Sequence, residues 1–171
     1  MEHTNSQLWT INDAEKLYRV KDWGNNYFHI SQDGEVHVRL NSKDPDASVS
    51  LMKIAQGLQE RGLKLPVLLR FSDILDDRIR YINESFGQAI VDAGYKGTYR
   101  GVYPIKVNQQ QQVIEEITQF GKLYHHGLET GSKPELIAAL AYVDDPEAYV
   151  ICNGYKDEEY IDLALRGLSM G

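Results

Sequence analysis

The stretch YRGVYPIKVNQQQQ, from Tyr99 to Gln112, decides the fold that this sequence predicts. Its first half is rich in aromatic and β-branched residues, which favours a strand, and its polar second half can begin a helix. A single lysine, Lys106, lies where the strand gives way to the helix. The next apolar residues recur with helical spacing: Val113, Ile114, Ile117 and Phe120.

The position of Lys106 suggests a chemical role. A lysine at the C-terminal end of an apolar strand is held near the face where ligands of α/β proteins gather. We expect its ammonium to be partly desolvated there, which favours the neutral amine and makes it a nucleophile. The alternative is an ordinary strand-end lysine whose ammonium extends into water.

Two further strand–helix units follow along the chain. Lys122–Glu129 is predicted as the second strand, and Ser132 with Glu135 makes a capping box for the helix after it. Residues 148–152 are predicted as a third, buried strand that ends at an Asn-Gly turn. The sequence therefore predicts three successive βα units.

Three polar residues occupy the same place in these units. Lys106, Glu129 and Asn153 are separated by 23 and 24 residues. A near-constant βα period implies parallel strands with their carboxyl ends on one side, so we expect the three side chains to converge. For Glu129 the alternative is a carboxylate that caps a helix or pairs with Lys133. For Asn153 it is an amide that only braces its turn.

The first 64 residues have a different pattern. Residues 27–31 and 35–40 flank an Asp-Gly pair, and their apolar positions alternate as in a half-buried hairpin. His29 and His37 lie on the opposite parity, facing solvent or a partner sheet. Because no third ligand has suitable spacing, we predict no metal site there.

We divide the chain into an N-terminal hairpin and helix segment, residues 1–64, and an α/β region, residues 65–171. The second region begins with a predicted strand, Leu65–Phe71, because the run is almost entirely apolar. Ser72 then has the position of an N-cap for the helix that follows.

Composition narrows the classes of function. The 171 residues carry a formal net charge of −7, which argues against nucleic acid or an anionic membrane as partner and suits a cationic substrate. The single cysteine, Cys152, excludes an internal disulfide and fits a reducing compartment. No apolar run reaches membrane-spanning length and the start lacks a secretory signal pattern, so we expect a soluble, cytoplasmic protein.

Four stretches together resemble the biosynthetic arginine decarboxylases, a branch of the pyridoxal-phosphate decarboxylases with an alanine-racemase-like barrel. The lysine motif alone indicates only this class of barrel enzyme, whereas the combination is specific to the arginine branch. The four stretches are Leu65–Leu75 (LPVLLRFSDIL), Val102–Gln109 (VYPIKVNQ), Gly127–Leu136 (GLETGSKPEL) and Ile151–Asp157 (ICNGYKD).

The resemblance implies an α/β fold in which three or four βα units of an incomplete pyridoxal-phosphate-binding (β/α)8 (TIM) barrel follow the N-terminal hairpin. It implies pyridoxal 5'-phosphate held as a Schiff base on Lys106, Glu129 as a catalytic carboxylate beside it, and Asn153 as a cofactor contact, with Mg²⁺ as an additional cofactor. The implied lyase reaction converts L-arginine to agmatine and carbon dioxide, on a route to putrescine and spermidine. The enzyme would be a homo-oligomer.

Length limits what these residues can do alone. A (β/α)8 barrel takes about 250 residues, and the resemblance places the contacts to the phosphate, the pyridine nitrogen and the guanidinium later in the polypeptide. We therefore expect an N-terminal portion that is inactive by itself. Two alternatives stay open: another barrel-type pyridoxal-phosphate enzyme (a diaminopimelate decarboxylase or a racemase), or a non-catalytic barrel protein that binds the cofactor.

Overall fold

The computed structural model describes residues 8–39 and 47–170. Contacts divide the chain into two compact units, one up to Ile74 and one from Leu75 onward, and each is described by itself. The division expected from sequence fell earlier, between residues 64 and 65, at the start of a predicted strand. Leu65–Phe71 forms no strand, and Leu65 and Leu68 are exposed. The prediction of a strand there was wrong, because Pro66 lacks an N–H and no described strand forms backbone hydrogen bonds with these residues.

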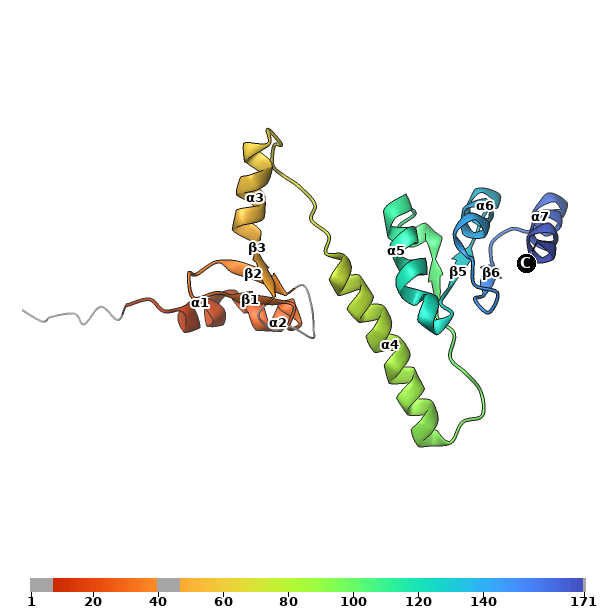
Figure 1. Cartoon of the computed structure of the whole chain (residues 1–171), viewed down its shortest axis with the longest axis horizontal. Helices are drawn as coiled ribbons and strands as arrows, with labels where there is room; N and C mark the ends of the chain where they lie inside the picture. The colour runs from red at the N-terminus through yellow and green to blue at the C-terminus, as the bar shows by residue number, and fades with distance from the viewer. Residues whose placement is uncertain (1–7, 40–46, 171) are drawn as a thin grey trace, which may run out of the picture. The chain divides into compact units, whose positions relative to one another are not determined.

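The first unit combines a three-stranded antiparallel sheet with short helices (Figure 1). The β1–β2 hairpin turns at Gly34, whose φ of +80° suits glycine. Phe28 lies opposite Val38, which is fully buried, so one face of the sheet forms the small core. The elements are α1 (Ile11–Tyr18), α2 (Val20–Gly24), β1 (Phe28–Ile30), β2 (Val36–Arg39), β3 (Ser48–Ser50) and α3 (Leu51–Glu60).

The second unit is a parallel sheet in the order β4–β5–β6, with a helix after each strand (Figure 1). The α/β class is therefore confirmed. The strands run parallel, as predicted from the spacing of the polar residues at their carboxyl ends. The elements are α4 (Ser72–Ala93), β4 (Val102–Pro104), η1 (Ile105–Val107), α5 (Gln111–Gly121), η2 (Lys122–Tyr124), β5 (Gly127–Thr130), α6 (Lys133–Tyr142), β6 (Val150–Cys152) and α7 (Glu158–Ser169).

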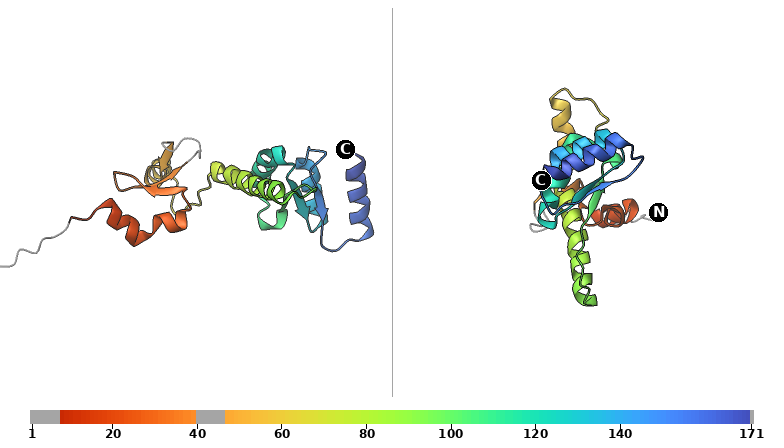
Figure 2. Two further views of the ribbon diagram at one scale, coloured as in Figure 1. Left: turned by 90° about the horizontal axis from the view of Figure 1, so that it is seen from below. Right: turned by 90° about the vertical axis from the view of Figure 1, so that its right-hand side faces the viewer.

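The core of the second unit lies between the sheet and helices α5 and α6, and α6 lies between α5 and α7 (Figure 2). Leu128 on the central strand and Ile105 in η1 are fully buried against α5 and α6. Since successive side chains of a strand point to opposite faces, Leu128 points to the helices and its neighbour Glu129 to the other face of the sheet. The packing of Leu128 therefore fixes the direction of the glutamate.

Two predicted strands have different limits in the structure. Lys122–Glu129 is a strand only over Gly127–Thr130, because α5 runs on into the 3₁₀ turn η2 and His125 adopts a positive φ of +52°. The third strand was expected to be buried. It is half-exposed, with Ile151 39% exposed, since β6 is the edge strand of the described sheet.

Candidate active site

Lys106 lies in the 3₁₀ turn η1, immediately after β4. The turn is fixed from both sides: Ile105 is buried in the core, and the Tyr103 hydroxyl donates to the Asn108 carbonyl oxygen at 3.3 Å. The Lys106 side chain is exposed, so the partial desolvation expected from sequence is absent in this structure. The described sheet has only three parallel strands, so little of it covers this turn, and the lysine stays in contact with water. Within the described residues, no ion pair or hydrogen bond joins Lys106 to Glu129.

Glu129 is the buried carboxylate of the site, only 7% exposed, on the face of β5 opposite to Leu128. In register it pairs with Pro104, the last residue of β4 and two residues before Lys106. Its Oε1 accepts a hydrogen bond from Asn153 Nδ2 at 2.9 Å. The alternative partner, Lys133, instead pairs with carboxylates of α7 and its N-cap. The structure therefore brings two of the three predicted site residues, Glu129 and Asn153, into direct contact.

Asn153 follows β6 and extends the ladder, since its N–H donates to the carbonyl oxygen of Thr130 at 2.7 Å. The next residue, Gly154, has a φ of +73°, and a Cβ there would lie 2.2 Å from the carbonyl oxygen of Gly131. The turns after β5 and β6 therefore touch backbone to backbone. This close approach sets the position from which the Asn153 amide reaches Glu129.

A buried network supports these turns from the helix side of the sheet. Tyr160 of α7 is fully buried, and its hydroxyl lies 2.9 Å from Thr130 Oγ1 and 3.3 Å from the Thr130 carbonyl oxygen. Burial raises the pKa of Tyr160 above its ordinary value, so the group stays a neutral hydroxyl. Thr130 is thus held on the strand next to Glu129. The sequence did not predict this network, because a tyrosine in a helix gives no signal of what it will contact.

Charged side chains tie the N-terminal ends of α6 and α7 together. Lys133 Nζ lies 2.7 Å from Asp157 and also pairs with Glu159. The hydrogen bond to Asp157 raises the pKa of Lys133, and the same bond lowers the pKa of Asp157. Ser132 Oγ accepts from the Glu135 N–H, whereas the Glu135 carboxylate bonds to Gly131 N at 2.6 Å. The predicted Ser132 cap is therefore present, but the Glu135 carboxylate accepts from the N–H of Gly131 instead of that of Ser132.

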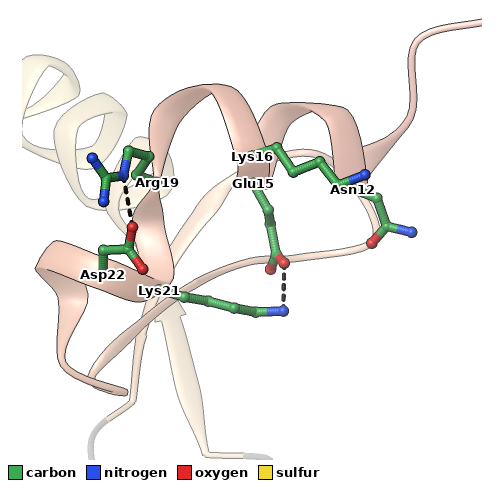
Figure 3. Close-up of a pocket in the computed structure, with 6 residues that line it drawn as sticks. All are labelled: Asn12, Glu15, Lys16, Arg19, Lys21 and Asp22. Atoms are coloured by element: carbon green, nitrogen blue, oxygen red, sulfur yellow. Dashed lines mark hydrogen bonds and ion pairs between the residues drawn. The ribbon is translucent and has the colours of Figure 1, made fainter.

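Two hollows lie away from these strand ends. One, a pocket of about 490 Å³, lies on the first unit (Figure 3), and two of the three cations that line it are paired: Arg19 Nε lies 2.7 Å from Asp22 and Lys21 Nζ 2.6 Å from Glu15. The other, of about 660 Å³, lies between α6, β6 and α7 and is lined mostly by apolar side chains. Neither pocket contains Lys106, Glu129 or Asn153, which lie at the ends of β4–β6.

The described ranges, 8–39 and 47–170, contain no group of three or more His, Cys, Asp or Glu side chains placed to hold a metal ion. No helix in them is long and apolar enough to cross a bilayer. His29 and His37 form a cross-strand pair with ring centroids 5.6 Å apart, and His37 Nδ1 lies 3.0 Å from Ser48 Oγ.

Similarity to known proteins identifies the family of this chain. Residues 79–168 match the pyridoxal-binding domain of the pyridoxal-dependent decarboxylases, and the chain belongs to that family. The particular relatives are biosynthetic arginine decarboxylases. That of Thermosynechococcus vestitus is 49% identical over 98% of this chain and 26% of its own length, and that of Gloeobacter violaceus is 48% identical over 96% and 26%.

A solved structure similar to this chain is also that of a biosynthetic arginine decarboxylase. The crystal structure of the biosynthetic arginine decarboxylase SpeA from Campylobacter jejuni superposes with a TM-score of 0.80 at 36% identity, over 90% of this chain and 25% of that one. The chain thus spans about a quarter of the length of the relatives that it matches.

Proposed function

We propose that these residues are the N-terminal portion of a biosynthetic arginine decarboxylase, in which pyridoxal 5'-phosphate is attached to Lys106. The observation that carries the proposal is the combination of an exposed amine at the end of β4 with the Glu129–Asn153 pair at the ends of β5 and β6. It occurs in a chain nearly half identical to arginine decarboxylases along almost its whole length.

The donor set fits this cofactor. Pyridoxal phosphate has an aldehyde that reacts with a primary amine, and Lys106 Nζ has no hydrogen-bond or ion-pair partner among the described residues. When bound, the cofactor supplies the electron sink that makes loss of an α-carboxylate feasible. The neighbouring carboxylate, Glu129, has one oxygen fixed by Asn153 and the other without a hydrogen bond among the described side chains.

We assign the residues as follows. Lys106 would hold the cofactor through its amine. The oxygen of Glu129 that Asn153 does not hold would carry a proton of the Lys106 ammonium or of the substrate amine. The resemblance implies a cofactor contact for Asn153, whose amide donates to Glu129 in this structure. The resemblance places the contacts to the phosphate and the guanidinium later in the polypeptide, so the 171 residues alone are expected to be inactive.

Other features follow from the resemblance and belong to the same proposal. The product, agmatine, would feed putrescine and spermidine synthesis, and the complete enzyme would be a cytoplasmic homo-oligomer with a TIM barrel and a Mg²⁺ requirement. The support is the identity to enzymes named for biosynthesis, while the net charge of −7 suits a cationic substrate.

The test is release of labelled carbon dioxide from a panel of carboxyl-labelled amino acids, assayed with the full-length protein that carries these residues. We expect release from arginine and not from diaminopimelate, ornithine or lysine, and none from residues 1–171 alone. Release only from diaminopimelate, or a lysine-bound cofactor with no release from any amino acid, would support one of the alternative functions instead. Turnover by residues 1–171 would contradict the expected inactivity.

A further inference from the structure

Asn153 and Glu129 are a matched pair rather than two independent contacts. The amide is a donor at Nδ2, the carboxylate an acceptor at Oε1, and the two are joined at 2.9 Å between adjacent strands. Glu129 is 7% exposed, whereas Asn153 is exposed. The hydrogen bond therefore extends from an accessible amide to a nearly buried carboxylate, which has no other hydrogen bond among the described side chains.

This geometry restricts what each group can do. A carboxylate with a free torsion at its end can rotate between two roughly equivalent orientations, whereas one with Oε1 held presents only Oε2 to a ligand. A hydrogen bond to a charged acceptor is shorter and stronger than one between neutral groups. The second amide atom, Oδ1, is an acceptor and cannot replace the donor in this contact.

The backbone around Asn153 is also fixed. Its N–H is bonded to Thr130, and the following glycine rests on the carbonyl of Gly131. Thr130 is in turn held by the buried Tyr160. The amide is thus presented from a rigid support, as a group that positions another side chain must be.

We infer that Asn153 is a positioning residue, which acts through Glu129 by fixing Oε1 so that Oε2 faces the amine of Lys106 and its ligand. The inference rests on the proposed function and deepens it, because it gives Asn153 a role through the Glu129 carboxylate in place of the cofactor contact that the resemblance implies. It requires that loss of the amide changes catalysis only while Glu129 is present.

The test is a double-mutant cycle in the full-length protein, with Asn153→Ala, Glu129→Ala and both together; alanine is chosen at residue 129 because glutamine would keep an oxygen that accepts from Asn153. Loss of a hydrogen bond to a charged group corresponds to about a tenfold effect, so we expect Asn153→Ala to lower kcat about tenfold and leave KM for arginine nearly unchanged. In the Glu129→Ala background the same replacement should lower kcat by less than about twofold. Equal effects in both backgrounds would show that Asn153 contacts the cofactor or substrate directly and would overturn the inference.

Asn153→Asp separates positioning from simple bracing of the turn. Aspartate suits such a turn about as well as asparagine, but it replaces the donor by a second carboxylate beside Glu129. We expect kcat to fall below that of Asn153→Ala, because like charges repel. Near-wild-type activity of Asn153→Asp would mean that the residue only shapes the backbone, and the inference would be wrong.

A matched control is available on α5. Gln111 Nε2 donates to Glu115 Oε1 at 2.8 Å, which is the same amide-to-carboxylate contact on an exposed helix face. Gln111→Ala is expected to leave kcat within about twofold of wild type. A tenfold loss there would show that the effect at Asn153 is not specific to the site and would overturn the inference.

A readout independent of turnover completes the test. Dissociation of pyridoxal phosphate from the protein, followed by the visible absorbance of the lysine-bound cofactor, should change by less than about threefold in Asn153→Ala, whereas a direct cofactor contact predicts a loss of tenfold or more. Borohydride trapping on Lys106 in the same samples reports on the proposed function separately. If borohydride traps the cofactor on Lys106 but the double-mutant cycle shows no coupling between Asn153 and Glu129, only the inference is refuted. If borohydride traps no cofactor on Lys106 of the wild-type protein, the proposed function itself is refuted.

Discussion

Replacement of Gly154 by alanine tests the contact between the two turns at the active-site edge. The new Cβ would lie 2.2 Å from the carbonyl oxygen of Gly131, and the residue would keep a φ of +73°. The left-handed backbone costs an alanine about 1–2 kcal/mol. Because both sides of the contact are backbone, the clash is relieved only by moving a turn, which costs a further 1–3 kcal/mol or so.

Gly94→Ala provides the matched control in the same unit. Gly94 follows α4 with a φ of +60°, and nothing lies within 4 Å of a Cβ built there. It should therefore show the backbone cost of about 1–2 kcal/mol without the clash. The difference between the two variants isolates the contact between Gly154 and Gly131, and we expect it to be about 1–3 kcal/mol.

The measurement is urea-induced unfolding of residues 1–171, followed by far-ultraviolet circular dichroism with tryptophan fluorescence recorded on the same samples. Within these 171 residues both tryptophans, Trp9 and Trp23, belong to the first unit, so their fluorescence reports on that unit only. We expect the dichroism transition to move to lower urea in Gly154→Ala while the tryptophan transition stays unchanged. Equal free energies of unfolding for Gly154→Ala and Gly94→Ala, within about 0.5 kcal/mol, would refute the close approach of the turns.

Two further predictions concern buried polar groups of the second unit. Tyr160→Phe leaves the Thr130 hydroxyl without its partner, so the free energy of unfolding in urea should fall by about 1–3 kcal/mol, and an unchanged midpoint would contradict the network. Burial lowers the pKa of His126 below its ordinary value of 6.5, so the unfolded chain binds more protons and stability is lost as pH falls through that value. Between about pH 7.5 and pH 5.5 the wild-type dichroism transition should weaken more than that of His126→Asn; equal pH dependence in the two proteins would argue against the role of His126.

The sequence predicted what depends on periodicity. A βα repeat of nearly constant length places strand ends together, so the parallel order and the polar tips at Glu129 and Asn153 could be expected from residue spacing alone. The start of a helix could also be predicted where a side chain caps it by a hydrogen bond to a nearby backbone N–H, as Ser132 does. These are properties of short segments, which sequence patterns describe well.

Features that depend on contacts between residues far apart in the chain could not be predicted from the sequence. The run Leu65–Phe71 looks like a strand by composition, yet strand formation needs a neighbouring ladder, and no described strand supplies one. The desolvation expected for Lys106 likewise depends on what surrounds its turn, and the side chain is exposed. The bond between Glu129 and Asn153 depends on register and turn geometry, which spacing alone does not determine.

The identity of the lysine that carries the cofactor tests the proposed chemistry most directly. The full-length protein would be treated with pyridoxal phosphate and borohydride, digested, and mapped by mass spectrometry beside a Lys106→Arg variant. We predict a single reduced cofactor adduct on Lys106 that is absent from the variant. An adduct on a different lysine, or equal labelling of the variant, would contradict the assignment of Lys106 and with it the proposed site.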